Sequence, residues 1–428
     1  MKPRISQVLR VAATAGLLFG GTAAALSHQQ AKAAGPVNIV FWMGPDTQGG
    51  DQQLVTMFNK QYAGKIHVSY QPQAADTGAY FSTVSRALQA KSTAVDVIGG
   101  DVIWPAQLAS RGDLLALDSY FAKSRWNQYL DGPILDVQYK GHIYGTPWFT
   151  DYGLIYYRKD LLAKYNLPVP TTWGQMQSEA VTLVKKGAVK EGFVFQGNQY
   201  EGLVCNALEF INGAGGRIYG PDAAKTQAQA AKGLQTMASM ISSGAAPKAV
   251  TTYQESQSEN DFRGGLAAFI RNWPYAWGDT QTASQGSKVV GKVGVLPLLH
   301  EPGQATGYST LGGWQLAINK YSAHPNEAWQ FINYLISPAA QKFKAISEGH
   351  TMSLKSTYSD SAVVKANPWF STVIPQLHIL PRPTSPVYND ISLRMQKDFH
   401  GVLDGSMSAS DAVSDVEKFV SVAEARFQ

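Results

Sequence analysis

The sequence of 428 residues contains a single cysteine, Cys205. One cysteine excludes a disulfide within the chain, even in an oxidising compartment. The neighbours of Cys205 are Leu203, Val204, Ala207 and Leu208, so we expect a buried, unreactive thiol. The stability of the protein must therefore come from hydrophobic cores, and a chain of this length is long enough for two of them.

Charge is also scarce, because Asp, Glu, Lys and Arg together make up only 16% of the residues. The formal net charge is +5, but four basic residues and no acidic residue lie within positions 1–33. The rest of the chain is thus close to neutral. A near-neutral protein has no electrostatic reason to bind nucleic acid or an anionic membrane surface, so we expect neither partner.

Long hydrophobic runs are absent beyond the N-terminus. There, three basic residues precede an uncharged run at positions 11–26, and Ala31-Lys32-Ala33 follows. This pattern predicts a secretory signal peptide at residues 1–33, cleaved near Ala33/Ala34. The run is short for a membrane span, although an uncleaved anchor is the alternative. No cysteine near the cleavage site is available for lipid attachment, so we expect a freely diffusing periplasmic protein.

Motifs for catalysis and cofactor binding are missing too. The sequence has no G-x-S-x-G, no Walker A motif and no H-E-x-x-H. The eight histidines lack metal-ligand spacing, and we interpret them as exposed loop residues: His28, His67, His142, His300, His324, His350, His378 and His400. We therefore expect no cofactor, no metal and no enzymatic activity. A secreted carbohydrate-active enzyme stays open as an alternative, because Asp101 and Asp151 match in type the two carboxylates of a glycosidase.

Alternating strand and helix patterns are present in the first part of the chain. Periods of two and of 3.6 residues predict strand and helix in turn at 37–42, 52–62, 66–70, 80–90, 95–98 and 104–110. Asp51 is the expected N-cap of the first helix. This alternation predicts a parallel α/β sheet, in which ligands bind at the carboxyl ends of the strands. Asp101 lies just beyond one of those ends.

A second α/β block follows from Gly153. The patterns predict strands and helices at 153–157, 172–186, 193–195, 203–211, 223–242, 267–270, 293–298 and 314–318, with a further helix from Pro325. Thr172 and Gln175 have the spacing of a capping box. Two such blocks in one chain predict two lobes.

Aromatic residues are abundant, with 10 Trp and 20 Tyr, and many stand beside Gly, Pro or Asn. Aromatic rings cover the C–H face of a sugar, while carboxylates, amides and guanidinium groups bind its hydroxyls. Five short segments combine both kinds of residue: 100–104, 148–152, 271–277, 311–314 and 381–383. These segments indicate an aromatic-lined cleft for a carbohydrate.

Several of these segments resemble the extracellular solute-binding proteins of ABC importers, the family of maltose- and trehalose/maltose-binding proteins. The resemblance is carried by the stretches 96–115, 144–162, 272–277, 311–314 and 329–335, and it extends over nearly all of the mature chain. It implies an α/β fold of the two-lobe periplasmic-binding-protein type (type II), with a ligand cleft between lobes that three hinge crossings join.

The resemblance also implies where each lobe begins and ends. The N-terminal lobe is expected at residues 36–148 and 272–318, and the C-terminal lobe at 149–271 and 319–428. The crossings are expected near 146–150, 271–273 and 318–321.

A set of ligand-binding residues follows from the same resemblance. Asp101 and Asp151 are expected to accept sugar hydroxyls, and Arg382 to donate to them. Trp273 and Trp314 are expected to stack on sugar rings, and Phe149 is a further aromatic member of the set. Gly312 and Gly313 are expected to offer backbone groups. Weaker candidates are Gln48, Asp76, Thr77, Trp148 and Tyr275. The loop at 46–50 departs from the acidic pattern of disaccharide binders, which leaves the sugar undefined.

The implied function is that of a monomeric substrate-binding component of an ABC sugar importer. It would bind a mono- or disaccharide between the lobes and deliver it to the transmembrane subunits of the permease. A polyol, glycerol phosphate or an oligosaccharide remains an alternative ligand. A phosphate would require more than one positive group in the cleft, and only Arg382 and Arg271 are candidates.

Overall fold

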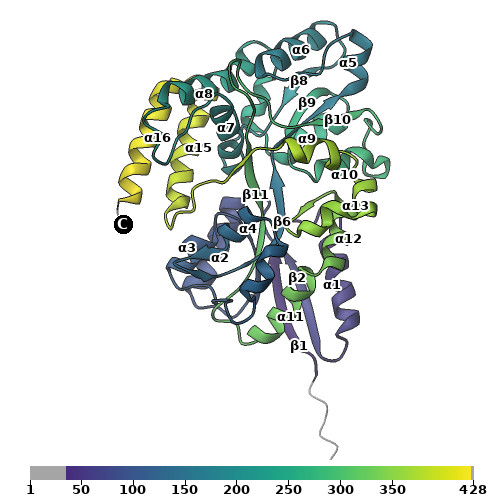
Figure 1. Ribbon diagram of the computed structural model, residues 1–428, viewed down its shortest axis with the longest axis vertical. Coiled ribbons are helices and arrows are strands. Elements are labelled where there is room, and N and C mark those ends of the chain that lie inside the picture. Colours follow the sequence, from purple (N-terminus) through teal and green to yellow (C-terminus); the bar gives the residue numbers. More distant parts are fainter. Residues whose placement is uncertain (1–34, 426–428) are drawn as a thin grey trace, which may run out of the picture. The chain divides into compact units, whose positions relative to one another are not determined.

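The computed structural model describes residues 35–425, so the expected signal peptide at 1–33 lies outside the described residues. Two large sheets with helices around them, together with a two-stranded sheet, form this part of the chain (Figure 1). The expected α/β class is therefore confirmed. Within residues 35–425, no helix is both long and apolar enough to cross a membrane.

The first sheet combines parallel strands near the N-terminus with later antiparallel ones. In spatial order it contains β12 (Thr351–Met352), β6 (Thr146–Tyr152), β11 (Ser309–Ile318), β3 (Val97–Asp101), β1 (Val37–Met43) and β2 (Ile66–Pro72), and β13 (Ile379–Leu380) pairs with β11. Strands β2, β1 and β3 run parallel, as the alternation predicts. Strand β11 lies antiparallel between β3 and β6, so it joins two distant parts of the chain.

Helices of the first sheet come from both ends of the sequence. They are α1 (Gly50–Gln61), α2 (Thr77–Gln89), α3 (Pro105–Ser110), α11 (Pro325–Leu335) and α12 (Pro338–Glu348). Phe331 of α11 packs edge-on against Phe41 of β1 at 5.3 Å and against Phe58 of α1 at 5.0 Å between ring centroids. These three buried rings fix α11 on the first sheet.

The second sheet has four strands, in the order β10 (Val293–Leu296), β7 (Leu154–Arg158), β9 (Ala267–Asn272) and β8 (Glu191–Val194). The helices around it are α5 (Lys159–Tyr165), α6 (Trp173–Lys185), α7 (Glu201–Gly213), α8 (Gln227–Ser242), α9 (Glu255–Arg263), α15 (Tyr388–Asp404) and α16 (Ala409–Glu424). Every residue of α7 is buried, because α8, α15 and β11 all pack against it. Cys205 lies on α7 and is buried, as expected.

The remaining α-helices and strands are short. They are α4 (Asp131–Asp136), β4 (Gln138–Tyr139), β5 (His142–Ile143), α10 (Ala276–Gln281), α13 (Ser361–Ala366) and α14 (Phe370–Val373). Helix α10 packs against both α9 and α12.

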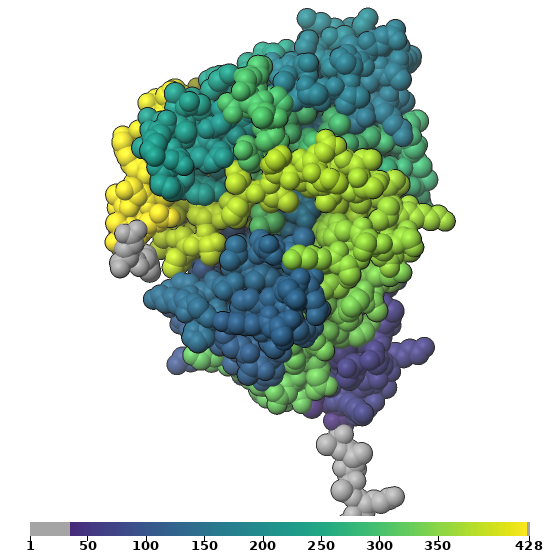
Figure 2. All heavy atoms as spheres, in the orientation of Figure 1, coloured from purple at the N-terminus to yellow at the C-terminus, as the bar shows by residue number. Residues whose placement is uncertain are grey.

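The chain passes between the two sheets three times, but only the first passage lies near its expected position. It occurs at Gly153, between β6 and β7. The second falls at 297–308, between β10 and β11, and not at 271–273. The third falls at 381–387, between β13 and α15, and not at 318–321. On the face shown in Figure 2, the yellow-green part of the chain near this third passage lies against both the teal and the blue parts.

The expected lobe boundaries are consequently wrong in two places. Residues 272–318 do not all belong with the first sheet, because β10 pairs with β7 of the second. Residues 319–428 do not all belong with the second, because α11 and α12 pack against α1. The apolar periodicity of α11 shows that one of its faces is buried, but it carries no information about which sheet that face meets.

Two predicted N-terminal caps can be compared with the structure. The capping box at Thr172 is confirmed, since its Oγ1 accepts a hydrogen bond from the backbone N of Gln175 at 3.3 Å. The expected N-cap role of Asp51 is wrong, because α1 begins at Gly50 after Gly49 with φ 83°. Asp51 instead lies inside the first turn and pairs with Lys344.

Asp136 of α4 offers a test of how burial affects a carboxylate. Its side chain is buried, its Oδ2 has no hydrogen-bond partner, and burial raises its pKa to about 7. The folded chain therefore holds this proton more tightly than the unfolded chain. The resulting penalty on the folded state is absent below about pH 4 and complete above about pH 7. An Asp136→Asn variant should gain about 1–3 kcal/mol of stability at pH 8 and little at pH 4.

Urea unfolding of the Asp136→Asn variant at both pH values measures this gain. Asp131→Asn, on the same helix, is the matched control, because the Asp131 side chain is 92% exposed. It should change stability at neither pH. An equal effect of the two substitutions would contradict the role of burial.

Candidate functional site

A cavity of about 530 Å³ lies where residues of both sheets and their helices meet. This volume is within the range of small-molecule binding sites. Eleven of the thirteen expected site residues line it: Asp101, Phe149, Asp151, Trp273, Gly312, Gly313, Trp314, Arg382, Gln48, Thr77 and Tyr275. Strand pairing explains part of this convergence, because Trp314 of β11 lies opposite Asp101 of β3 and Phe149 of β6.

The two other expected residues, Asp76 and Trp148, do not line the cavity. Asp76 caps α2 by accepting a hydrogen bond from Ala79 N at 2.8 Å, and it also accepts one from Gln254. Trp148 is fully buried, with its ring 6.0 Å from that of Phe41. Side chains alternate across a strand, so Trp148 points into the core while its neighbour Phe149 faces the cavity.

Trp314 is held in place by other aromatic rings. It is half-buried, its ring centroid lies 6.0 Å from that of Trp104, and it stacks against Tyr80 at 6.1 Å. Trp104 and Tyr80 are themselves buried. This support fixes the indole of Trp314 before any ligand arrives.

Trp273 is also fixed before binding, by three different contacts. The guanidinium of Arg271 lies 3.8 Å from the centroid of its ring, and its Nε1 donates to Glu255 Oε1 at 3.2 Å. Its third contact is Gly312, where an added Cβ would lie 3.0 Å from the indole. A rigid, half-buried indole is a suitable platform for the apolar face of a sugar ring.

The two glycines of β11 serve the packing of the strands. Gly313 has φ 113°, and a Cβ there would lie 2.4 Å from the carbonyl oxygen of Phe149. Only glycine fits both the backbone angle and the space. The Gly313 carbonyl accepts a hydrogen bond from Val102 N, and that of Gly312 accepts one from Thr150 Oγ1. Both carbonyls thus take part in the fold, and both glycines line the cavity, so their expected role of offering backbone groups to a ligand stays a prediction.

Arg382 connects carboxylates from two different elements. Its two terminal nitrogens donate at 2.8 Å to Asp101 Oδ1 of β3 and at 2.8 Å to Glu201 Oε1 of α7. Tyr388 and Ser392 of α15 also donate to Glu201. Burial raises the pKa of Asp101, although Arg382 opposes this effect. The two carboxylates thus use two of the five N–H groups of Arg382, and its Nε has no partner. The expected role of Arg382 as a donor to the sugar stays a prediction.

Lys344 forms a second buried network at the cavity, which the sequence did not reveal. Its Nζ donates to Asp51 Oδ1 at 2.6 Å and to Glu348 Oε2, and Glu348 Oε1 accepts from Gly50 N at 3.1 Å. The same ammonium lies 5.0 Å from the ring centroid of Phe149. Because Asp51 and Lys344 are 293 residues apart, no sequence motif could have paired them.

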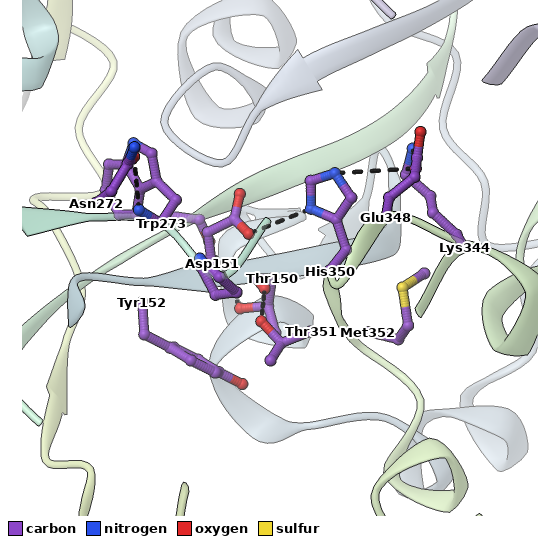
Figure 3. A network of polar contacts seen from close by, with 12 residues as sticks. Thr150, Asp151, Tyr152, Asn272, Trp273, Lys344, Glu348, His350, Thr351 and Met352 are labelled. Carbon is purple, nitrogen blue, oxygen red and sulfur yellow. Dashed lines mark hydrogen bonds and ion pairs between the residues drawn. The ribbon is translucent and has the colours of Figure 1, made fainter. Parts of the chain in front are cut away.

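His350 is another residue of this region that the sequence did not reveal. It was expected to be an exposed loop histidine, but its side chain is only 13% exposed and lines the cavity. Its ring lies between two carboxylates, with Nδ1 3.5 Å from Asp151 Oδ1 and Nε2 4.0 Å from Glu348 Oε2 (Figure 3). The ring also packs against Phe149 at 4.3 Å between centroids.

The cavity contains more carboxylates than cations. Each lining cation, Arg263, Lys344 and Arg382, lies within 4.0 Å of at least one carboxylate. Acidic residues of α7, α9 and α10 that the sequence analysis did not select line the wall: Glu201, Glu255, Glu259 and Asp279. The sequence of α9, which is almost entirely polar, could have indicated the part of this wall that α9 forms. A site with neutralised cations favours an uncharged polar ligand over an anion.

The sequence is similar to that of known binding proteins. The family model of bacterial extracellular solute-binding proteins matches residues 44–342. A probable ABC transporter-binding protein of Deinococcus radiodurans is 33% identical over 424 residues, which cover 95% of this chain and 97% of that protein. The chain therefore belongs to the bacterial extracellular solute-binding proteins, and the resemblance found in its motifs is confirmed.

Solved structures agree with this assignment. The maltose-bound MalE3 of T. maritima is 33% identical and superposes with a TM-score of 0.84 over 90% of this chain and 99% of that one. An ABC transporter solute-binding protein of Thermotoga lettingae, bound with α-D-tagatose, superposes with a TM-score of 0.80 and is 22% identical. The superposition covers 90% of this chain and 98% of that one. Together they confirm the expected two-lobe periplasmic-binding-protein fold.

Proposed function

We propose that this protein is the substrate-binding component of an ABC importer and that it binds an uncharged mono- or disaccharide in the cavity. The observation that carries the proposal is the pairing of pre-positioned indoles with buried carboxylates. Trp273 and Trp314 present apolar faces, while Asp151 presents an acceptor without a hydrogen-bond partner. This combination matches the two surfaces of a sugar ring.

The similarity to maltose-bound MalE3 supports a saccharide, and the relative from Deinococcus radiodurans supports an importer. We further propose that the protein acts as a monomer in the periplasm after loss of residues 1–33. Ligand would favour a closed form, because only that form contacts it from both lobes, and the closed form would dock on the permease.

A panel of ligands tests this function directly. Maltose, trehalose, glucose, mannitol, glycerol 3-phosphate and a uronic acid would be screened by thermal shift, and the binders measured by calorimetry. We expect a neutral saccharide to raise the unfolding temperature by several degrees, because a ligand at 100 times its Kd adds about 2.7 kcal/mol. We expect no shift from the two anions. Binding of glycerol 3-phosphate alone would contradict the proposal.

We propose that binding occurs without turnover, and chromatography of the same incubations tests this point. The bound saccharide should be recovered unchanged after prolonged incubation. Hydrolysis products in stoichiometric excess over protein would support a carbohydrate-active enzyme instead. A loss of those products in an Asp151→Asn variant would then locate the activity in this cavity.

A further inference from the structure

We propose that His350 and Asp151 together form a subsite for one hydroxyl group of the bound saccharide. This inference rests on the proposed function and adds to it a residue that determines specificity. The hydroxyl would donate its hydrogen to Asp151 Oδ1 and accept one from His350 Nδ1.

The distance between the two groups is the first support. Asp151 Oδ1 and His350 Nδ1 are 3.5 Å apart, which is longer than a normal hydrogen bond between such atoms. Both atoms are buried, and neither has a hydrogen-bond partner. A buried polar atom without a partner costs about 1–3 kcal/mol, so a group that satisfies both atoms at once binds favourably here. A hydroxyl group can do so, because it both donates and accepts.

The surroundings of His350 hold its ring in this orientation. Phe149 packs against the imidazole at 4.3 Å and Tyr275 at 5.9 Å between ring centroids. On the other side, Nε2 faces Glu348, whose carboxylate is bound to Lys344. In Figure 3 the ring lies between the two carboxylates, with Nδ1 directed at Asp151. Because the donor and the acceptor are both fixed, the affinity depends on whether a hydroxyl group is present and on how it is oriented.

The position of the pair places this subsite beside the stacking platform. Asp151 of β6 lies opposite Gly312 of β11, and Gly312 contacts the indole of Trp273. A sugar ring on Trp273 therefore brings its equatorial hydroxyls to the Asp151–His350 pair. An analogue that lacks the matching hydroxyl leaves both buried atoms without a partner, and sites of this kind reject such analogues strongly.

The test combines a residue change with removal of single hydroxyl groups. Calorimetry would use maltose, or the tightest-binding saccharide of the panel if maltose does not bind, and its monodeoxy analogues. His350→Phe keeps an aromatic ring against Phe149 but removes both nitrogens. We expect it to weaken binding of the parent sugar at least about tenfold. One monodeoxy analogue should bind the wild type about tenfold more weakly than the parent sugar does. The same analogue should bind the variant less than threefold more weakly than the parent sugar does. His350→Gln, which retains a donor, should recover part of the affinity.

His142→Phe is the matched control. His142 also faces a carboxylate, with Nδ1 3.3 Å from Asp118 Oδ2, but its side chain is 61% exposed and lies outside the cavity. This control should bind every sugar like the wild type.

Two results would overturn the inference. One is parent-sugar affinity of His350→Phe within twofold of the wild type. The other is that His350→Phe weakens the binding of the parent sugar and of every analogue by the same factor. Each missing hydroxyl would then cost the variant as much affinity as it costs the wild type, as a purely structural role of His350 predicts. Failure of the wild type to bind any saccharide would instead refute the proposed function. If His350→Phe does not fold, His350→Leu carries the same comparison, because leucine also removes both ring nitrogens.

Discussion

Replacing Arg382 by methionine is expected to lower the free energy of unfolding by about 3–5 kcal/mol. Arg382 is 2% exposed on its side chain and neutralises Asp101 and Glu201, which are both buried. Methionine fills much of the same volume but leaves two carboxylates without a cation. Such a removal costs far more than the intact network contributes, because the remaining charges stay desolvated.

The loss from Arg382→Met should depend on pH. Burial already raises the pKa of Asp101, and Arg382 is the main group that lowers it. Without Arg382 this pKa rises further, so the variant gains stability relative to the wild type as acid protonates the carboxylates. The deficit is therefore largest at neutral pH and shrinks towards pH 4. Urea unfolding of the wild type and the variant at pH 7.5 and 4.5 measures it.

Arg394→Met provides the comparison for Arg382→Met. Arg394 also contacts two carboxylates, Asp398 and Asp415, but its side chain is 30% exposed. Solvent reaches Arg394 and Asp415, which is 40% exposed, and only Asp398 is buried, so this variant should lose clearly less stability than Arg382→Met. If both arginine variants lose the same stability, the explanation by burial is wrong.

Replacing Trp273 by alanine is expected to weaken saccharide binding by about 10- to 100-fold while the protein stays folded. The indole is half-buried and held by Arg271, Gly312 and Glu255, so its orientation is fixed without ligand. Alanine removes the platform on which a sugar ring loses its contact with water. Trp273→Phe, which keeps a flat ring, should retain most of the affinity. Calorimetry with the tightest-binding sugar measures both variants.

Trp126→Ala is the matched control for this substitution. Trp126 is also half-buried and also has a cation over its ring, Lys123 at 5.5 Å, but it does not line the cavity. The Trp126→Ala variant should bind the same sugar with unchanged affinity. Wild-type affinity in Trp273→Ala would place the sugar elsewhere. Asp151→Ala should lose binding in the same assay, because it removes an acceptor that faces the cavity.

Much of the fold could be predicted because its signals are local. The strands β1 and β2 and the helices α1 and α2 follow from apolar periodicity, and the start of α6 follows from its capping box. The three passages between the sheets were harder to place. Strand β10 and helix α11 have ordinary apolar faces, and such faces fit either sheet. Only their pairing with β7 and with Phe41 decides where they lie.

The candidate site divides in a similar way. Residues that stand beside aromatic, glycine or proline residues, such as Trp273 and Trp314, could be selected from sequence because their segments are unusual. Lys344, Glu348 and His350 could not. They lie on or next to α12, an ordinary amphipathic helix, and reach the cavity only because α12 packs against α1.

The sequence by itself determined the class of the fold, the family and the aromatic character of the cavity, because periodicity and motifs depend on neighbours along the chain. Only the tertiary structure decided the electrostatics. Arg382, expected to bind a sugar, is neutralised by Asp101 and Glu201, while His350, expected in an exposed loop, faces Asp151. Charge pairing and desolvation depend on distances in space between residues that are far apart in the chain, and folding alone sets those distances.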